Sequence, residues 1–215
     1  MGVRKIGFSM KRAWITIGSF DGIHLGHQKI IDNLVKGAKK NGVPSIVITF
    51  YPHPAVHIRN ITDPYYLTSP EEKDQILSKL GVNSVLTMHF DHSVSQLSPR
   101  DFINTLHRQL KFTCLLVGYD FRLGTDREGD LKTLEYLGDE MGFCVQAIKP
   151  FQKQSKPISS SIIRSALKKG DLSTANTMLG YPYSIEGIVG HGDGRGKHIG
   201  IPTANLSVWK KKLLP

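Results

Sequence analysis

Cysteine is scarce in this 215-residue sequence, which has only Cys114 and Cys144. Neither belongs to a closely spaced pair of the kind that holds structural zinc, so a cysteine zinc site is excluded. Each lies in an apolar run typical of a buried strand, residues 113–117 for the first and 143–148 for the second. We therefore expect two buried free thiols rather than a disulfide.

Long hydrophobic runs are also missing. No apolar stretch approaches the roughly 20 residues that cross a bilayer. The short apolar segment after the basic N-terminus runs into Asp21 and does not resemble a signal peptide. We expect a cytoplasmic protein with no membrane partner. No group of Asp, Glu and His has the spacing of a protein-held metal site, so magnesium, if used, is expected to arrive mostly with a nucleotide.

Acidic residues are the minority charge. The sequence has 18 of them against 28 Lys and Arg, for a net charge of +10. Such an excess is typical of proteins that bind nucleic acid, an anionic surface or phosphorylated small molecules. The basic runs, such as residues 210–212, are short and do not alternate with aromatics. We interpret them as solvated faces and expect no nucleic-acid partner.

Strand-like apolar runs alternate with helical patterns through the first 180 residues or so. The expected strands are residues 13–17, 45–50, 84–88, 114–117 and 143–148. The expected helices are residues 26–40, 70–80, 99–110, 131–141 and 160–169. This alternation predicts an α/β fold, a Rossmann-like doubly wound parallel sheet with helices on both faces. Ligands of such sheets bind beyond the C-terminal ends of the strands.

Some helix ends carry clear signals. Ser69 precedes Pro70 and stands three residues before Glu72, which predicts a capping box. Ser98, followed by Pro99 and Asp101, repeats the pattern. Gly81 and Gly170 stand where helices end in a left-handed residue.

The pattern changes near residue 182. Residues 184–189 predict a strand, residues 190–200 are rich in glycine, and no helical period returns. We expect two units, 1–182 and 183–215. The second has about 33 residues, fewer than the ~40 that a domain usually needs to fold unaided. It is either a fragment of a β domain or an appendage packed on the first unit.

The segment from Gly18 to His27 is the most informative part of the chain. It connects the end of an expected strand to the start of an expected helix, and the N-terminus of a helix favours anions. His24 and His27, beside small glycines, form a compact cationic or hydrogen-bonding clamp. The pattern predicts phosphate binding and charge stabilisation during nucleotidyl transfer. The alternative is a pair of structural or solvated histidines in a turn.

Further unusual residues follow later strands. Pro52 and Pro54 stiffen a loop that presents His53, or else hold a rigid turn with an incidental histidine. The loop 118–129 combines an aromatic, a carboxylate and two arginines, which suits a ring plus a phosphate; the alternative is a surface loop held by an Arg–Asp pair. In segment 158–164, Ser160 or Ser161 can cap a helix whose N-terminus holds a phosphate with help from Arg164.

In this order, the motifs resemble the bacterial bifunctional riboflavin kinase/FAD synthetase family. The resemblance runs from about residue 13 to residue 215. It is carried by segments 18–28, 49–54, 117–124 and 158–164, and by two in the tail, 179–183 and 200–206. The His-x-Gly-His turn alone marks the wider nucleotidyltransferase superfamily, and the whole ordered set marks the narrower family.

The resemblance implies a module that transfers AMP from ATP to FMN with magnesium, giving FAD and pyrophosphate without a protein nucleophile. It implies that His24 and His27 hold the ATP phosphates. Ser160, Ser161 and Arg164 would clamp these phosphates from the opposite side. The cofactor-binding residues it implies are Gly18, Ser19, Phe20, Asp21 and Gly22 for the nucleotide, and His53, Asp120, Phe121 and Arg122 for the acceptor loops.

The sequence departs from the family pattern in several places. Ser161 replaces the usual threonine, Lys197 an arginine and Ile201 a phenylalanine. Thr203 and Asn205 match the ATP–magnesium motif of the kinase module, whose acidic partner is absent from the sequence. We therefore expect no riboflavin kinase activity. The alternatives are a nucleotidyltransferase acting on another phosphorylated small molecule, a non-catalytic flavin-binding protein, and a basic nucleic-acid binder.

Overall fold

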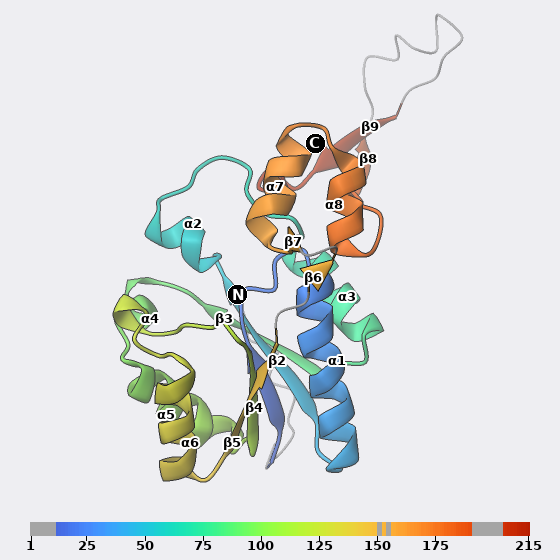
Figure 1. The fold of residues 1–215 in the computed structure, drawn as a ribbon. Helices are drawn as coiled ribbons and strands as arrows, with labels where there is room; N and C mark the ends of the chain where they lie inside the picture. Colours follow the sequence, from blue (N-terminus) through green and yellow to red (C-terminus); the bar gives the residue numbers. More distant parts are fainter. Residues whose placement is uncertain (1–11, 150–151, 154–155, 191–203) are drawn as a thin grey trace, which may run out of the picture.

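A five-stranded parallel sheet lies at the centre of the molecule (Figure 1). The computed structural model describes residues 12–149, 152–153, 156–190 and 204–215. The strands occur in the order β3-β2-β1-β4-β5. Their bounds are β1 Trp14–Ile17, β2 Ser45–Tyr51, β3 Ser84–His89, β4 Cys114–Gly118 and β5 Cys144–Ile148. The predicted parallel sheet is confirmed, and the ends of its five predicted strands agree to within one residue. The strand expected at residues 184–189 starts three residues later, at Gly187.

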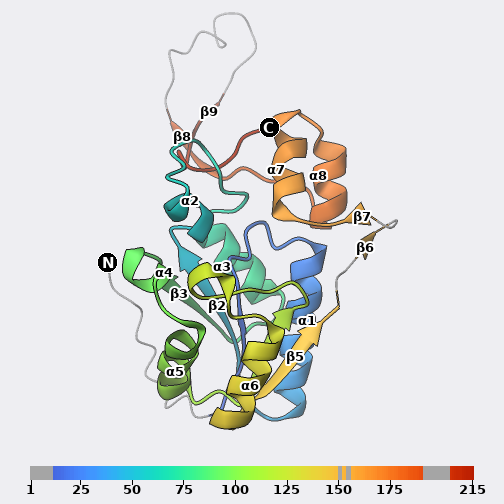
Figure 2. The same cartoon turned by 60° about the vertical axis from the view of Figure 1, so that its left-hand side comes forward.

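Helices cover both faces of this sheet, as predicted for a doubly wound fold. One face packs against α1 (Leu25–Lys40) and α3 (Pro70–Lys79), and the other against α5 (Pro99–Leu110) and α6 (Leu131–Met141) (Figure 2). Successive strand residues point to opposite faces, so Val47 joins the α1 and α3 cluster while Ile48 joins the other. Burial on both faces explains the continuous apolar runs of the three central strands, β1, β2 and β4, whereas the edge strands β3 and β5 are partly exposed.

The predicted helix signals are also confirmed. Ser69 and Glu72 form the reciprocal capping box of α3, and Ser98 caps α5. Gly81 and Gly170 adopt φ values of +85° and +72°. Among the described residues, three α-helices were not expected, α2 (Pro54–Ile58), α4 (His92–Ser95) and α8 (Leu172–Leu179), nor was the short 3-10 helix η1 (Thr125–Arg127). The first two span barely one turn, too short for a helical period to show.

Helices α7 (Ser160–Lys168) and α8 form a pair above the C-terminal ends of the strands (Figure 1). Their facing side chains make a third apolar cluster, which also takes in Leu67 and Leu213. This cluster holds the N-terminus of α7 over the edge of the sheet where ligands of α/β proteins bind.

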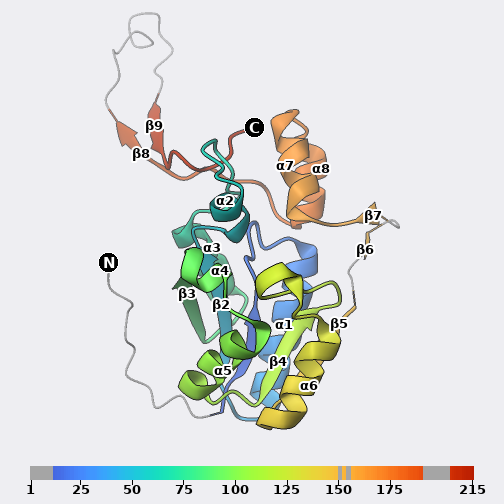
Figure 3. The same cartoon turned by 90° about the vertical axis from the view of Figure 1, so that its left-hand side faces the viewer.

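The tail contains an antiparallel ribbon of β8 (Gly187–Gly190) and β9 (Asn205–Val208), which extends away from the sheet (Figure 3). A second, two-residue ribbon, β6 (Gln152–Lys153) with β7 (Lys156–Pro157), precedes α7. After β9 the chain returns to the first unit. The carbonyl of Lys211 accepts the N–H groups of Tyr65 and Tyr66, and Leu213 is only 5% exposed. Residues 211–213 therefore pack on the first unit, while the boundary near residue 182 stays a prediction.

The expectation of two free thiols is wrong, because Cys114 and Cys144 form a disulfide. They are the first residues of β4 and β5, which lie side by side in the sheet with these two residues in register. Their Cα atoms are 4.5 Å apart, within the range that a disulfide spans. The apolar runs around the cysteines predicted strands, but only the strand order brings the two sulfurs together.

Candidate active site

Two adjoining cavities open at the C-terminal ends of β1 and β4. The larger, of about 570 Å³, lies between the N-termini of α1 and α7 and is lined by His24, His27 and Ser160 among others. The smaller, of about 350 Å³, lies toward α2, α4 and α5. The two share one wall, made by Ile17, Gly18 and Phe121. The strand-end loops therefore do meet at one edge of the sheet, as the fold predicts.

The turn between β1 and α1 is tightly wound. Phe20, Gly22 and Ile23 have φ values of +46°, +77° and +33°. Such an angle is a strained conformation for a β-branched isoleucine. The amide of Gln28 donates to the carbonyl of Ile23 over 2.9 Å and to that of Leu179 over 2.8 Å, which ties the turn to the end of α8. The turn thus delivers His24 to the start of α1.

His24 and His27 face each other across the first turn of α1. Their ring centroids are 3.7 Å apart with an interplanar angle of 15°. His24 caps the helix, because its Nδ1 accepts the backbone N–H of His27 over 3.3 Å. The proton of a neutral His24 is therefore on Nε2. The buried Nδ1 of His27 has no hydrogen-bond partner among the described residues.

Both histidines are neutral near pH 7. Burial lowers the pKa of His24 to about 4. Burial, followed by the charge of a protonated His24, lowers the pKa of His27 well below its usual value. Of the two forms that the sequence allows for this clamp, the structure favours the hydrogen-bonding one over the cationic one. Neutral imidazoles offer an anion N–H donors, and a bound anion would raise their pKa values.

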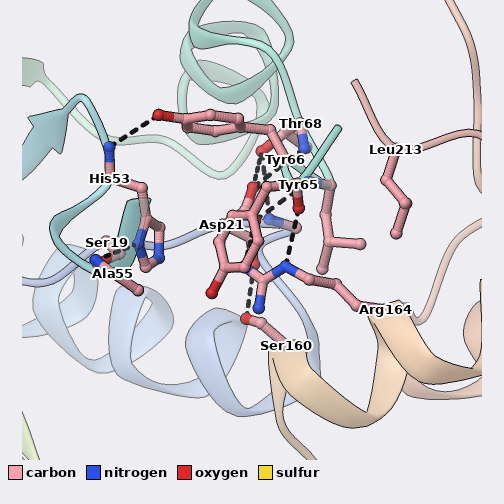
Figure 4. A network of polar contacts seen from close by, with 12 residues as sticks. Ser19, Asp21, His53, Ala55, Tyr65, Tyr66, Thr68, Ser160, Arg164 and Leu213 are labelled. Atoms are coloured by element: carbon pink, nitrogen blue, oxygen red, sulfur yellow. Dashed lines mark hydrogen bonds and ion pairs between the residues drawn. The ribbon is translucent and has the colours of Figure 1, made fainter. Parts of the chain in front are cut away.

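Asp21 lies at the centre of a buried polar network (Figure 4). It is 1% exposed and accepts hydrogen bonds from the backbone N–H groups of Leu67 and Thr68. It also forms an ion pair of 2.6 Å with Nη2 of Arg164. The guanidinium group of Arg164 lies 3.8 Å from the centre of the Tyr65 ring and donates Nε–H to the Tyr65 carbonyl. In this structure Asp21 and Arg164 therefore bind each other behind the cavity wall, and Gly22 sits beside them with its N–H on Thr68 Oγ1.

The serines at the start of α7 have separate roles. Ser159, not Ser160 or Ser161 as predicted, is the cap, and its hydroxyl accepts the N–H of Ile162. The reason is that α7 starts at Ser160, which is one residue earlier than a Ser160 cap requires and two residues earlier than a Ser161 cap requires. Ser160 lines the larger cavity and donates to the carbonyl of Asp21 over 2.9 Å, while Ser161 is exposed.

Most of the remaining predicted residues line one or both cavities. Gly18 and Phe121 line both, Phe20 and Asp120 line the larger, and Ser19 and Arg122 line the smaller, whereas His53 lines neither. His53 caps α2 through Nδ1, and burial lowers its pKa to about 4.

The assignment of Thr203 and Asn205 as metal ligands stays a prediction. Thr203 lies outside the described residues, and Asn205 is exposed at the start of β9. Among the described residues, no group of three or more His, Cys, Asp or Glu side chains could hold a metal ion. That part of the chain also contains no helix long and apolar enough to span a membrane.

Sequence reasoning missed the residues that support the site from behind. Thr68 and Tyr65 bind the Asp21–Arg164 pair, and Lys73 reaches under the β1–α1 turn to the carbonyl of Ser19. No motif marks the first two. Lys73 had a signal, because it stands three and four residues before the apolar Ile76 and Leu77 and so belongs to the buried face of α3.

Comparisons with known proteins point to one family. The chain matches the FAD synthetase family model over residues 8–162 and the riboflavin kinase family model over residues 179–215. A bifunctional riboflavin kinase/FMN adenylyltransferase from Listeria monocytogenes is 39% identical over 202 residues, covering 94% of this chain and 64% of the relative. The enzyme of that name from Escherichia coli is 39% identical over 195 residues, covering 89% and 62%. The chain therefore spans less than two thirds of the length of these curated relatives.

Among solved structures, the crystal structure of a macrolide-efflux protein from Streptococcus pneumoniae superimposes with a TM-score of 0.85 at 29% sequence identity. The alignment covers 98% of this chain and 68% of that one. The fold described here, tail included, is thus shared with an experimentally determined chain.

Proposed function

The chain belongs to the FAD synthetase family, and we propose that it transfers the AMP group of ATP to the phosphate of FMN, giving FAD and pyrophosphate. One observation carries the proposal. Two cavities of different character share a single wall at Ile17, Gly18 and Phe121, so ligands bound in each would meet there. A transferase that joins two nucleotides needs this arrangement, because both reactants must be held in contact.

The larger cavity fits ATP. The N-termini of α1 and α7 both lie at this cavity, and helix N-termini favour phosphate groups. We assign His24 and His27 to the phosphates as neutral N–H donors, with Ser160 and Ser161 on the opposite side. Gly26 lines the cavity beside them, and a Cβ there would come within 3.2 Å of the His24 ring. Arg164 would contribute through its hold on Asp21, or directly if the ion pair opens.

The smaller cavity fits the flavin ring of FMN. Its wall is largely aromatic and aliphatic, with Phe50, Phe90, Phe102 and Phe121, and it also contains Arg122 and Arg127. A flat apolar ring prefers such a wall, and an arginine fork pairs with a phosphate. We assign Asp120, which neighbours Phe121 of the shared wall, to the place where the two cavities meet. We assign His53 to support of the backbone at the start of α2.

The chemistry is a direct displacement. An oxygen of the FMN phosphate forms a bond to the α-phosphorus of ATP, and the bond from that phosphorus to the β-phosphate bridging oxygen breaks, releasing pyrophosphate. A phosphate monoester is already largely deprotonated at pH 7, so no general base is required. The protein positions the reactants and stabilises charge on the leaving group. We propose that magnesium enters as the ATP complex, since the described residues offer no protein-held metal cage.

The test is to incubate the protein with ATP, magnesium and FMN and to look for FAD by chromatography. Formation of FAD supports the proposal, and its absence with folded protein contradicts it. A parallel screen of other phosphorylated acceptors separates FMN from a different substrate. Bound flavin without turnover would indicate a storage protein, and steeply salt-dependent DNA or RNA binding would indicate a nucleic-acid partner.

Two further points belong to the proposal. We propose a cytoplasmic location, because ATP and FMN are both intracellular metabolites. The expected lack of riboflavin kinase activity also stays a prediction. Supplying riboflavin in place of FMN tests it, since a competent kinase module would produce FMN from riboflavin and ATP.

A further inference from the structure

Lys73 is a buried cation that forms no ion pair with a carboxylate of the described residues. Its side chain lies on the inner face of α3 and the residue is 6% exposed. Its Nζ donates to the carbonyl of Ser19 over 2.8 Å and to Oγ1 of Thr49 over 3.2 Å. Within the described part of the chain, no Asp or Glu oxygen lies within 4.0 Å of it, whereas the other buried lysine, Lys212, is paired with Glu72 at 2.6 Å.

Such an arrangement costs free energy of folding. Burial lowers the pKa of Lys73, and the negative charges of Asp21 and Asp74 only partly offset this effect. A buried charge without an opposite partner is among the least favourable features of a protein interior. A methionine would fill the same space on this helix without that cost. The position of the ammonium group must therefore serve something other than packing.

The Ser19 carbonyl is what the ammonium group holds. The same carbonyl also accepts the hydroxyl of Thr49 over 3.0 Å. On one side of Ser19, Gly18 belongs to the wall shared by both cavities. On the other side, the ring of Phe20 packs edge-on against His27, with centroids 5.2 Å apart. The peptide after Ser19 thus links the shared wall to the phosphate-binding histidines.

We propose that Lys73 is a positioning residue of the nucleotidyl-transfer site. By donating a hydrogen bond to the Ser19 carbonyl, it fixes the position of Gly18 in the shared wall and the contact between Phe20 and His27. This geometry lets the two reactants meet. The charge of Lys73 lies beside the β1–α1 turn, next to the cavity assigned to the ATP phosphates, and adds a fixed positive potential there. This inference rests on the proposed FMN adenylyltransferase function.

The test compares Lys73→Met, which keeps an unbranched side chain only one atom shorter and removes the charge and the donors, with Lys73→Arg, which keeps both. Lys79→Met is the matched control, since it removes one positive charge from the exposed side of the same helix. We expect kcat for FAD formation to fall by about 10- to 100-fold in Lys73→Met. We expect Lys73→Arg to recover part of this loss, and Lys79→Met to behave as wild type.

A second readout does not depend on FMN being the acceptor. Amide hydrogen exchange of residues 18–23, followed by mass spectrometry, should be about tenfold faster in Lys73→Met than in wild type or Lys79→Met. If wild type forms no FAD but this difference is present, the proposed function fails and the positioning role stands. If the exchange rates and the kcat of Lys73→Met both lie within twofold of the wild-type values, the positioning role is overturned.

Loss of folding in Lys73→Met would not leave the matter open. Lys73→Gln removes the charge and keeps a neutral N–H donor, on a side chain that is one bond shorter. We expect its kcat to be lower than that of wild type and of Lys73→Arg. We also expect it to be higher than any activity that Lys73→Met retains. A Lys73→Gln enzyme with unchanged kcat and unchanged exchange, or a Lys73→Arg enzyme no better than Lys73→Gln, would contradict the proposal.

Discussion

His24 and His27 are stacked neutral imidazoles, with a backbone bond on one and an unpartnered nitrogen on the other. A buried polar atom without a partner is costly in a resting protein. It becomes favourable when a ligand supplies the missing partner. We therefore propose that this pair receives a group from the cavity, and a phosphate oxygen is the group that the helix N-terminus favours.

Substitution of His27 by Ala should lower kcat for FAD formation by about 10²- to 10³-fold, the usual effect of removing a donor that stabilises a charged transition state. FMN affinity should change little, because the flavin cavity is on the other side of the shared wall. Steady-state kinetics and FMN titration by fluorescence measure the two effects. His92→Ala, on an exposed helix start, is the control. Equal kcat in the two variants would refute the role of His27.

Asp21 and Arg164 illustrate what the sequence alone could not provide. Both were expected to face the nucleotide, and both instead bind each other across 143 positions of the chain. Nothing in the local sequence of either residue identifies the other. The motifs singled out both residues, but the ion-pair partner of each is a residue that only the fold brings near.

Asp21→Asn should destabilise the fold by about 3–5 kcal/mol, because it leaves the guanidinium group of Arg164 buried without its charge partner. Urea unfolding followed by circular dichroism measures the loss. Asp32→Asn is the matched control: Asp32 forms an exposed i,i+4 pair with Lys36, and such pairs contribute little. A loss in Asp21→Asn no larger than in Asp32→Asn would show that the network carries little stability.

At the scale of the elements, prediction succeeded where a local pattern decides the structure. The capping serines 69 and 98 and the glycines 81 and 170 were predicted correctly, because each depends on its own few neighbours. Helix α8 was missed although it spans Leu172–Leu179. Its apolar face is completed by α7 and by Leu213 of the tail, so the short stretch by itself shows too little of the period.

The disulfide joins the first residues of β4 and β5, whereas the site lies at the opposite, C-terminal ends of the strands. Reduction should therefore lower stability and leave kcat nearly unchanged. A bridge closing a loop of this length, with a sequence separation of 30, is worth about 2–4 kcal/mol. Urea unfolding with and without reductant measures the stability, and FAD formation measures the activity. Activity lost while the reduced protein is still folded would contradict this separation.

At the scale of the whole molecule, the candidate site is assembled from distant segments. The walls of the larger cavity come from residues 17–30, 118–121, 148–149 and 157–160, and the groups that support them from behind come from residues 65–73 and 164. Residues 211–213, which belong to the segment matching the riboflavin kinase family, bind the backbone of Tyr65 and Tyr66. The two cavities are lined by residues that follow all five strands of the sheet and by the start of α7, so segments far apart in the sequence meet there only through the topology.

This assembly buries three histidines in the neutral form, His24, His27 and His53, and that should make the whole fold sensitive to acid. The pKa values of His24 and His53 are lowered from 6.5 to about 4 by burial. Between these values the unfolded chain binds protons that the folded chain cannot, so stability falls as pH drops from about 6.5 to about 4 and levels off below. Each of these two groups contributes on the order of 1–3 kcal/mol.

The pH range identifies the histidines as the cause. Carboxylates with a lowered pKa, such as Asp130, lose their stabilising effect only as pH falls below about 4, which is a separate range. Urea unfolding at pH 7.5, 6, 5 and 4.5 should therefore show a decline that begins near pH 6.5. The variant His53→Asn, which keeps a side-chain acceptor for the α2 cap but does not titrate, should flatten this decline. A wild-type stability that stays constant down to pH 4.5 would mean that these imidazoles accept protons in the folded state, and the neutral hydrogen-bonding clamp assigned to His24 and His27 would then be wrong.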